Sequence, residues 1–216
     1  MKATTISRVH SGRRLVRWGL LILGILVLIP LGYYLYVVLW ASNFHTVVPG
    51  QVYRSAAPLG DDIEDWCQDY GLKSIVDLRA DGVSSTYPDE QTAADRAGAK
   101  LIYLRLSANK LPDGPMLREL IRVIETAPKP MLLHCQGGAD RASLASFIAA
   151  MAIGGQDYRQ AEKQFSIRYF QLQDDLPITR VLHLYRHWCR QQSVSTGGWQ
   201  QFRHWAFDEY DKKQPA

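Results

Sequence analysis

A long uninterrupted run of apolar residues is the first pattern along the chain. Residues 18–36 read WGLLILGILVLIPLGYYLY, and the sequence stays apolar to Trp40. Because a helix rises about 1.5 Å per residue, this run of about 23 residues is long enough to cross a hydrocarbon core of about 30 Å. Trp18 at one end and several tyrosines with Trp40 at the other are typical of the two membrane interfaces. The pattern predicts a transmembrane helix over residues 18–40.

A cleaved signal peptide is the alternative interpretation, but its apolar region is only about 7–15 residues long and ends at small residues. This run is longer and ends in VVLWASNF, so we expect an uncleaved anchor. By the positive-inside rule, residues 1–17 form a basic cytoplasmic N-terminus and the domain that follows lies across the membrane. In a bacterium, this means an inner-membrane protein with that domain in the periplasm. The basic residues before the run are Lys2, Arg8, Arg13, Arg14 and Arg17.

Beyond this run, short apolar stretches alternate with amphipathic ones. Residues 41–50 read as a linker, and QVYRSAAP over 51–58 reads as an edge strand that ends in a turn. Buried strands are predicted over 73–79, 100–106 and 129–135, and helices over 61–71, 87–98, 113–127 and 142–153, with further helical segments over about 157–169, 178–192 and 198–211. This alternation predicts one α/β domain over 51–216, in which helices flank a central, largely parallel sheet.

Composition changes this picture little. The chain has 216 residues, 47% of them hydrophobic, and a formal net charge of +4. Much of the basic excess precedes the apolar run, so the domain is close to neutral and shows no basic stripe; we expect no nucleic-acid partner. The three cysteines are too few for a disulfide framework. Cys67 and Cys189 are expected to be buried thiols, and a bridge between them stays open outside the cytoplasm.

The sequence HCQGGADR, residues 134–141, carries the candidate chemistry. It lies between a predicted strand and a predicted helix, and sites in open α/β sheets form at the carboxyl ends of strands. Gly137 and Gly138 permit sharp turns and a close approach of the backbone to a ligand. Backbone N–H groups and the helix N-terminus then form a cradle for an anion, and the planar guanidinium of Arg141 matches two oxygens of a phosphate.

The same electrostatic field acts on Cys135. A thiol beside a helix N-terminus and a cation ionises more readily than a free cysteine. The loop therefore places a thiolate beneath a bound phosphate. Attack of the sulfur on phosphorus would give a cysteinyl-phosphate, which water then hydrolyses. These residues predict phosphoryl transfer through Cys135.

With this loop, the chain resembles the cysteine-dependent protein tyrosine and dual-specificity phosphatases, whose signature is His-Cys-x2-Gly-x2-Arg. VYRSAAP and IVDLR are also similar to the bacterial and fungal-type dual-specificity branch, and the resemblance covers about residues 45–155. It implies that Cys135 is the nucleophile, that Arg141 binds phosphate and stabilises the transition state, and that His134 hydrogen-bonds the loop. It implies no metal or cofactor. The amides of the cradle would be those of Gln136, Gly137, Gly138, Ala139, Asp140 and Arg141.

One position departs from the family pattern. Members usually carry serine or threonine directly after the arginine, where the hydroxyl helps the sulfur to leave, but this chain has Ala142. Either Ser143 reaches back, or the intermediate breaks down slowly. A catalytically weak protein that binds phosphorylated partners therefore stays open. Rhodanese-like sulfur transfer also uses a cysteine loop, but His134 and Arg141 favour phosphate.

The leaving oxygen needs a proton, so we expect a carboxylic acid near the loop. Asp140 lies inside the loop, as in some bacterial relatives with a Gly-x-Asp-Arg sequence, including lipid-active ones. Asp113 lies upstream, in NKLPDGP, and also fits the N-cap of the helix predicted there. We favour Asp140 over Asp113 as the acid.

Further polar residues invite a role beside the loop. Arg54, from the first strand, could face the loop and bind substrate, although pairing with Asp77 and Arg79 would explain it as well. Tyr87 and Glu90 could touch substrate, with a place on a helix surface as the plainer interpretation.

The sequence thus predicts a single-pass, membrane-anchored phosphomonoesterase. Proteins that carry phosphotyrosine, phosphoserine or phosphothreonine are its first expected substrates. A short linker would keep the domain beside the headgroups, so a phosphoinositide or another phospholipid headgroup is the rival substrate. Substrate is expected to contact the loop residues 134–139, Ser143 and Arg54.

Overall fold

The computed structural model describes residues 6–39, 42–58, 60–79, 87–171 and 175–213. The chain forms two compact units, Met1–Ala41 and Ser42–Ala216. The first unit holds one long helix, α1 (Ile6–Leu39). The second holds the α/β domain.

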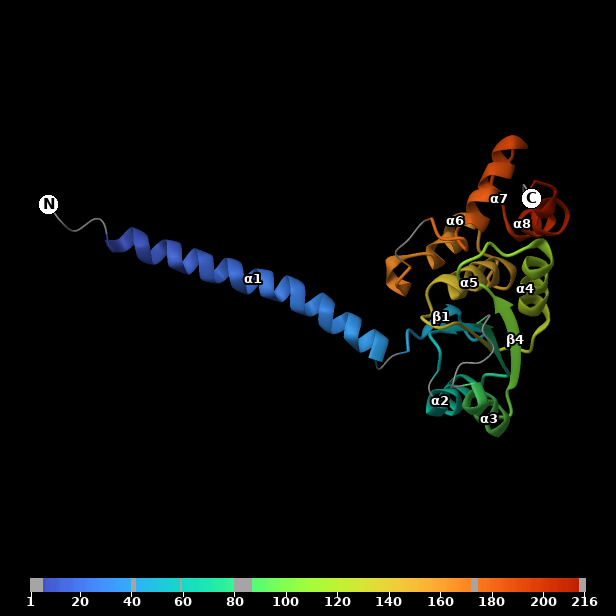
Figure 1. Cartoon of the computed structure of the whole chain (residues 1–216), viewed down its shortest axis with the longest axis horizontal. Coiled ribbons are helices and arrows are strands. Elements are labelled where there is room, and N and C mark those ends of the chain that lie inside the picture. The colour runs from blue at the N-terminus through green and yellow to red at the C-terminus, as the bar shows by residue number, and fades with distance from the viewer. Residues whose placement is uncertain (1–5, 40–41, 59, 80–86, 172–174, 214–216) are drawn as a thin grey trace. The chain divides into compact units, whose positions relative to one another are not determined.

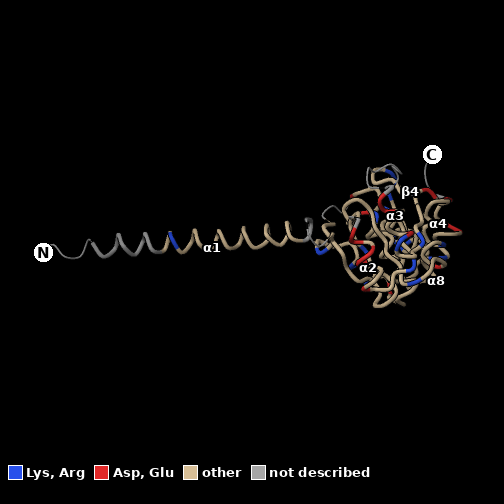
Figure 2. The backbone as a smooth tube through the Cα atoms, turned by 90° about the horizontal axis from the view of Figure 1, so that it is seen from below, with Lys and Arg blue, Asp and Glu red and all other residues tan. Residues whose placement is uncertain are grey.

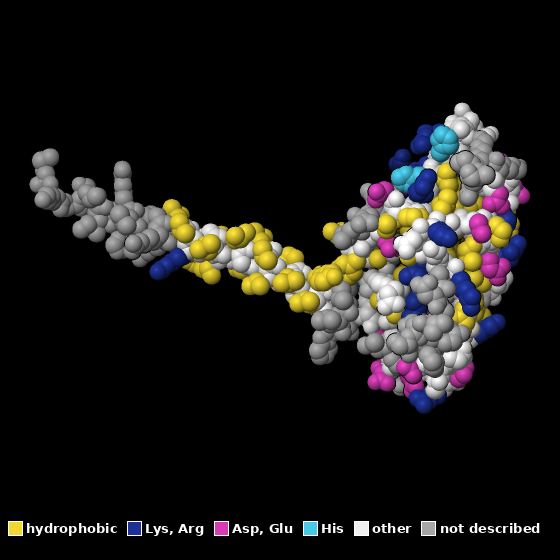
Figure 3. Space-filling view, in the orientation of Figure 1, with side chains coloured by type: hydrophobic (Ala, Val, Ile, Leu, Met, Phe, Trp, Pro, Cys, Tyr) yellow, Lys and Arg dark blue, Asp and Glu magenta, His cyan; other side chains and the backbone are white. Residues whose placement is uncertain are grey.

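The helix α1 is apolar over most of its length. Its segment Leu15–Tyr36, of 22 residues, is long and apolar enough to cross a membrane. Figure 3 shows hydrophobic side chains along this segment, and Figure 2 shows a basic position near its start and no charged position along the rest of its coloured length. The helix begins before the expected span of residues 18–40, because the arginines and leucine that precede Trp18 are good helix formers.

Within the described residues, five strands form one sheet in the order β1-β2-β5-β3-β4. The strands are β1 (His45–Val48), β2 (Val52–Ser55), β3 (Ser74–Arg79), β4 (Lys100–Leu106) and β5 (Met131–His134). β1 and β2 are antiparallel, and the pairs β2–β5, β5–β3 and β3–β4 are parallel. The expected α/β fold with a largely parallel sheet is confirmed, and so are the three strands. β3 and β5 are fully buried, whereas β4 is only partly buried because it lies at the edge of the sheet.

The linker expected over residues 41–50 is wrong in part, because β1 lies within it. This strand pairs with β2 across a turn at Gly50, whose φ of +68° favours glycine. Val47 and Val48 are buried in the core. The strand expected at the edge, β2, lies between β1 and β5 instead. Pairing with β1 satisfies the backbone groups that β2 would expose as an edge strand.

Helices cover both faces of the sheet. Those nearest to it are α2 (Gly60–Tyr70), α3 (Tyr87–Ala97), α4 (Gly114–Thr126) and α5 (Asp140–Ala152). α2 and α3 lie side by side on one face, and α4 and α5 lie on the other (Figure 1). Side chains alternate along a strand, so on β3 Ile75 joins the smaller core under α2 and α3, and Val76 joins the main core under α4 and α5. All four helices were predicted from the sequence.

The C-terminal part packs into the main core through Tyr185, Phe202 and Trp205. Its segments are α6 (Tyr158–Ala161), the 3-10 turns η1 (Glu162–Gln164) and η2 (Ile167–Tyr169), α7 (Arg180–Gln191), α8 (Trp199–His204), the π-helical turn η3 (Trp205–Glu209) and the 3-10 turn η4 (Tyr210–Lys213). The single helix expected over 157–169 is broken, because Ser166 has an extended backbone. Cys67 and Cys189 are free thiols, so the bridge left open between them is not formed.

Candidate active site

The carboxyl ends of three neighbouring strands meet at one edge of the sheet. In the strand register, Ser55 of β2 and Asp77 of β3 both lie beside His134 of β5. This is the edge at which ligands bind in open α/β sheets. β5 ends at His134, and Cys135, which follows it directly, is only 2% exposed.

The loop from Cys135 to α5 packs closely against the end of β2. Gly138 has a φ of +65°, and a Cβ there would lie 2.6 Å from the backbone nitrogen of Ala56 and 2.7 Å from the carbonyl carbon of Ser55. The N–H of Ala57 donates to the carbonyl oxygen of Gln136 at 3.2 Å. Only glycine combines this backbone conformation with this contact, so β2 sets the path of the loop.

Arg141 lies in the first turn of α5 and is 9% exposed. Its Nη1 donates to the carbonyl oxygen of Leu106, the last residue of β4, at 3.5 Å. Within the described residues, this is its one hydrogen bond, although a guanidinium has five N–H donors. The geometry therefore leaves N–H donors of Arg141 available for an anion at the loop. Arg141 lies at one end of this loop and Cys135 at the other.

Arg54 is completely buried and reaches the loop from β2. Its Nη2 donates to the carbonyl oxygens of Gly138 at 2.7 Å and Ala139 at 3.3 Å. Its Nη1 donates to the backbone and side-chain oxygens of Gln164, both at 3.0 Å, and its guanidinium lies 4.0 Å from the ring centroid of Tyr169. Burial lowers the pKa of Arg54 to about 10, which still leaves the side chain charged at neutral pH.

These contacts correct two expectations for Arg54. Its guanidinium has no exposed area and binds carbonyl oxygens of the loop, so it supports the loop rather than contacting substrate. It also takes no part in a pair with Asp77, whose ionic partner is Arg79. Gln164 and Tyr169, which hold Arg54 from the other side, carry no signal in the sequence, because their contacts join segments far apart along the chain.

Ser143 does not reach back to the sulfur in this structure. Its hydroxyl is completely buried and accepts a hydrogen bond from Arg54 Nη2 at 2.9 Å. No hydrogen bond among the described residues joins it to Cys135. Ala142 is also completely buried and has no hydroxyl. Neither residue after Arg141 therefore makes a hydroxyl hydrogen bond to Cys135 among the described residues.

The two candidate acids have different surroundings. Asp113 is exposed, and its carboxylate accepts a hydrogen bond from the N–H of Met116 at 2.8 Å, which makes it the N-cap of α4. Asp140 is half-buried at the start of α5. Burial raises the pKa of Asp140 above its ordinary value, and the positive charge of Arg141 opposes this rise. A shift in this direction is the one that a general acid requires.

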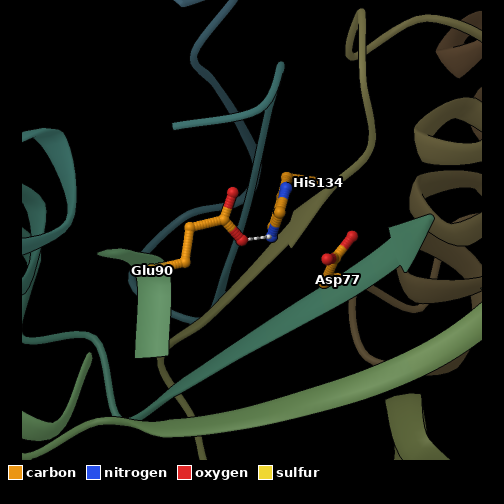
Figure 4. Close-up of side chains that lie close together, drawn as sticks. All are labelled: Asp77, Glu90 and His134. Atoms are coloured by element: carbon orange, nitrogen blue, oxygen red, sulfur yellow. Dashed lines mark ion pairs between the residues drawn. The ribbon is translucent and has the colours of Figure 1, made fainter. Parts of the chain in front are cut away.

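Buried ionic side chains surround His134, and Figure 4 shows two of them, Glu90 and Asp77, on either side of its ring. The Nη2 atom of Arg79 lies 2.6 Å from Glu90 Oε2 and 2.8 Å from Asp77 Oδ2. The same oxygen of Glu90 lies 3.8 Å from His134 Nε2. Glu90 is only 1% exposed, so its expected place on a helix surface is wrong. Tyr87, the other residue of α3 that was expected to touch substrate, has a side chain outside the described part of the chain.

This cluster does not fit a metal ion. Ligand atoms of Asp77, Glu90 and His134 lie within 4.8 Å of one another. The guanidinium of Arg79 donates to both carboxylates, however, and occupies the place that a cation would take. The positive charge that these carboxylates need is therefore supplied by the protein itself.

His134 is completely buried, and neither of its ring nitrogens has a hydrogen-bond partner among the described residues. The backbone of Cys135 nevertheless lies close enough to raise the pKa of His134, so the hydrogen bond to the loop expected from the resemblance stays a prediction. Burial lowers the pKa of His134 to about 4, although Asp77 opposes this shift. The ring is neutral at neutral pH, with Glu90 as its nearest ionic neighbour.

Comparisons with known proteins agree with this fold. A family model described as "DSP-PTPase phosphatase fused to NAD+ Kinase" matches residues 49–175. Inositol diphosphatase SIW14 of Saccharomyces cerevisiae is 31% identical over 106 residues, which are 46% of this chain and 36% of that protein. The chain thus matches about a third of the length of this relative.

Solved structures share the fold at low sequence identity. The core catalytic domain of the S. cerevisiae PP-IP phosphatase SIW14, in complex with citrate, has a TM-score of 0.55 and 19% identity, and the match covers 70% of this chain and 93% of that one. P. aeruginosa TpbA, as a cysteine-to-serine variant in complex with pTyr, has a TM-score of 0.52 and 20% identity, with 65% and 82% covered. These likenesses concern the fold alone.

The α/β fold and the loop from Cys135 to Arg141 define a phosphatase of the tyrosine and dual-specificity class. The matched family model covers more than half of the chain. The chain belongs to the family of DSP-PTPase phosphatases fused to NAD+ kinase.

Proposed function

We propose that this phosphatase hydrolyses phosphomonoesters through a covalent intermediate on Cys135. The sulfur attacks phosphorus, the P–O bond to the leaving group breaks, and Asp140 donates a proton to the leaving oxygen. Water then attacks the cysteinyl-phosphate, which releases inorganic phosphate and restores the thiolate. Arg141 binds the phosphate oxygens through both steps.

The observation that carries this proposal is the orientation of the loop's peptide groups. In a trans peptide, the C=O of one residue and the N–H of the next point in opposite directions. Arg54 holds the carbonyl oxygens of Gly138 and Ala139 on its own side. The N–H groups of Ala139 and Asp140 therefore face away from Arg54, into the concave side of the loop, where they can bind an anion.

The chemistry is tested by Cys135→Ser in the full chain, purified in detergent under reducing conditions. Wild-type protein is expected to hydrolyse para-nitrophenyl phosphate, and Cys135→Ser is expected to lose turnover by at least about 10³-fold, because a serine hydroxyl is un-ionised at neutral pH. Cys67→Ser, which changes a thiol on α2, is the matched control and keeps wild-type turnover. Turnover that survives in Cys135→Ser would exclude the mechanism.

Two other activities of the loop give different results in the same assay. A phospho-binding module binds inorganic phosphate without turnover, as the buried Ala142 would allow if the intermediate broke down slowly. A sulfur transferase forms a persulfide on Cys135 with a sulfur donor, which mass spectrometry detects.

For the substrate, we propose phosphorylated proteins as the first class, with phosphotyrosine, phosphoserine or phosphothreonine as the group removed. The shared fold with TpbA, which was solved with pTyr, supports this choice. The supporting observation in this chain is the open surface of the loop itself, where Gln136 and Gly137 are exposed.

A phosphorylated inositol, free or as a lipid headgroup, is the second candidate. The named activity of the relative SIW14 supports it. A groove of about 830 Å³ also lies beside Gln164 and Tyr169, the residues that hold Arg54, and Arg159, Lys163 and Arg168 contribute positive charge to it. A panel of phosphopeptides, soluble inositol phosphates and vesicles that contain phosphoinositides separates the two classes by kcat/KM.

We also propose that α1 is an uncleaved single-pass anchor. Its apolar segment Leu15–Tyr36 and the arginine-rich sequence before it support an N-terminus in the cytoplasm. In a bacterium, the phosphatase domain would then lie in the periplasm.

A further inference from the structure

A short segment before β1, Ser42 and Asn43, lies in the interior of the α/β unit. The two residues are 9% and 2% exposed. Both have left-handed backbones, with φ of 43° and 46°, which non-glycine residues seldom adopt. The N–H of Ala56 donates to the carbonyl oxygen of Ser42 at 2.7 Å, and Ser42 Oγ donates to Asp62 Oδ2 of α2 at 2.8 Å. This segment therefore has one defined conformation beside the end of β2.

Asn43 contacts the phosphate loop directly. Its Nδ2 donates to the carbonyl oxygen of Gly137 at 3.1 Å and, more weakly, to the carbonyl oxygen of Tyr169 at 3.4 Å. The contact with Gly137 joins residues 94 positions apart in the chain. No motif in the sequence points to it, since Asn43 falls in the stretch that reads as a linker.

His45 fixes the direction of the Asn43 amide. Its Nε2 lies 3.0 Å from Asn43 Oδ1, and its ring meets Tyr169 edge-on at 5.0 Å between centroids. Burial, together with the positive charges of Arg54 and Arg168, lowers the pKa of His45 to about 4. The neutral ring can donate from Nε2 to Oδ1, which leaves the Nδ2 group of Asn43 pointing at the loop.

We propose that Asn43 is a positioning residue for phosphate binding and catalysis at this loop. It holds the carbonyl oxygen of Gly137, so the N–H of Gly138 faces the opposite way, into the anion cradle. Arg54 does the same for the next two peptide groups. Asn43 and Arg54 together orient three consecutive peptide groups before any ligand binds.

The need for Asn43 follows from the two glycines. The peptide between Gly137 and Gly138 joins the two residues that restrict backbone rotation least, so it can flip at low cost unless its oxygen is held. Arg54 reaches the oxygens of Gly138 and Ala139 but makes no hydrogen bond with that of Gly137 within the described residues. Asn43 supplies the missing donor. The inference rests on the proposed function, because it assumes that the loop binds phosphate.

The test uses the full chain in detergent and two substitutions of Asn43. Asn43→Gly keeps the left-handed backbone accessible but removes the amide, and Asn43→Asp keeps the shape of the side chain but places an acceptor against the oxygen of Gly137. Ser42→Ala is the matched control, because it removes a hydrogen bond of the same segment that goes to α2 and not to the loop. The readouts are the melting temperature, the Kd for orthovanadate by calorimetry, and kcat and KM for para-nitrophenyl phosphate.

Orthovanadate affinity and kcat are expected to fall about tenfold in Asn43→Gly and more in Asn43→Asp, which corresponds to the loss of one well-placed donor to an anion. Ser42→Ala is expected to keep both values within about twofold of wild type, and its melting temperature should be similar to those of the Asn43 variants. Vanadate affinity that is unchanged in both Asn43 variants, or lost equally in Ser42→Ala, would overturn the proposal. If wild-type protein binds vanadate but has no turnover, the proposed hydrolysis fails while the binding data still decide the role of Asn43.

Discussion

At the scale of single residues, Asp140 and Asp113 show how surroundings divide two carboxylates between roles. The carboxylate of Asp113 is exposed and is used as a helix cap. Asp140 is half-buried beside Arg141, and burial raises its pKa. The carboxylate of Asp113 is therefore engaged with the backbone of its own helix, whereas Asp140 lies beside the loop, where we propose that it acts as the acid.

We therefore predict that Asp140→Asn is selective for the leaving group. Hydrolysis of phenyl phosphate, whose leaving group needs a proton, is expected to fall about 10²-fold or more, and hydrolysis of para-nitrophenyl phosphate only a few-fold. Asp113→Asn is the matched control and keeps both rates. Steady-state kinetics on the two esters measures this, and an equal loss on both esters in Asp140→Asn would argue against its role as the acid.

At the scale of elements, α3 is linked to the sheet through a buried carboxylate. Glu90 carries the ion pair with Arg79 at the end of β3 and approaches His134 at the end of β5. Burial raises the pKa of Glu90 to about 7, although Arg79 lowers it. Between its ordinary pKa of 4.5 and about 7, the folded state therefore binds more protons at Glu90 than the unfolded state does. The contribution of Glu90 to stability is present below pH 4.5 and falls as the pH rises to about 7.

Glu90→Gln is predicted to remove this dependence. The difference in free energy of unfolding between wild type and Glu90→Gln should move against wild type by on the order of 2–3 kcal/mol as the pH rises from about 4.5 to about 7. Urea unfolding followed by tryptophan fluorescence measures it. Asp95→Asn, which removes an exposed carboxylate of the same helix, should keep the wild-type dependence. A constant difference between wild type and Glu90→Gln would show that Glu90 keeps its ordinary pKa in the fold.

The elements themselves were largely predictable because their apolar residues follow the periods of strands and helices. β3, β4 and β5 were found from apolar runs, α4 from amphipathic spacing, α5 from its apolar sequence, and α2 and α3 with the help of the glycines that end them. β1 was missed because HTVV is short, begins with two polar residues and is followed by Pro49-Gly50. Its place depends on the hairpin with β2, and pairing between strands is not visible in the apolar pattern of a four-residue segment.

At the scale of the whole molecule, the proposed anchor α1 would set where the phosphatase acts. Its apolar segment Leu15–Tyr36 is long and apolar enough to cross a membrane. An apolar helix of this length is favourable in the hydrocarbon core of a bilayer.

We predict that the chain stays in the membrane fraction after an alkaline carbonate wash. Mass spectrometry of the intact protein is expected to show that the N-terminal segment is still present. Leu26→Arg places a charge near the middle of the segment, at a cost of about 3 kcal/mol for insertion, and should release part of the protein. Asp69→Arg, an exposed position on α2, is the matched control and should leave fractionation unchanged. A soluble product that lacks the segment would identify it as a cleaved signal.

The sequence by itself determined the class of phosphatase and the order of the elements apart from β1. Cys135, Gly138, Asp140 and Arg141 lie within one short stretch, and their local spacing is enough to predict a nucleophile, a turn and an anion-binding cation. The apolar run of α1 is equally local. Such features depend on neighbours along the chain, which a single sequence displays in full.

Only the tertiary structure decided what holds the loop. Arg54, which the sequence suggested for substrate, lies behind the loop with no exposed area, and Glu90, expected on a helix surface, is buried beneath His134. Asn43 falls in an expected linker and yet binds Gly137. These roles arise because the sheet brings β2, β3 and β5 side by side, so polar groups from distant segments must satisfy one another inside the protein.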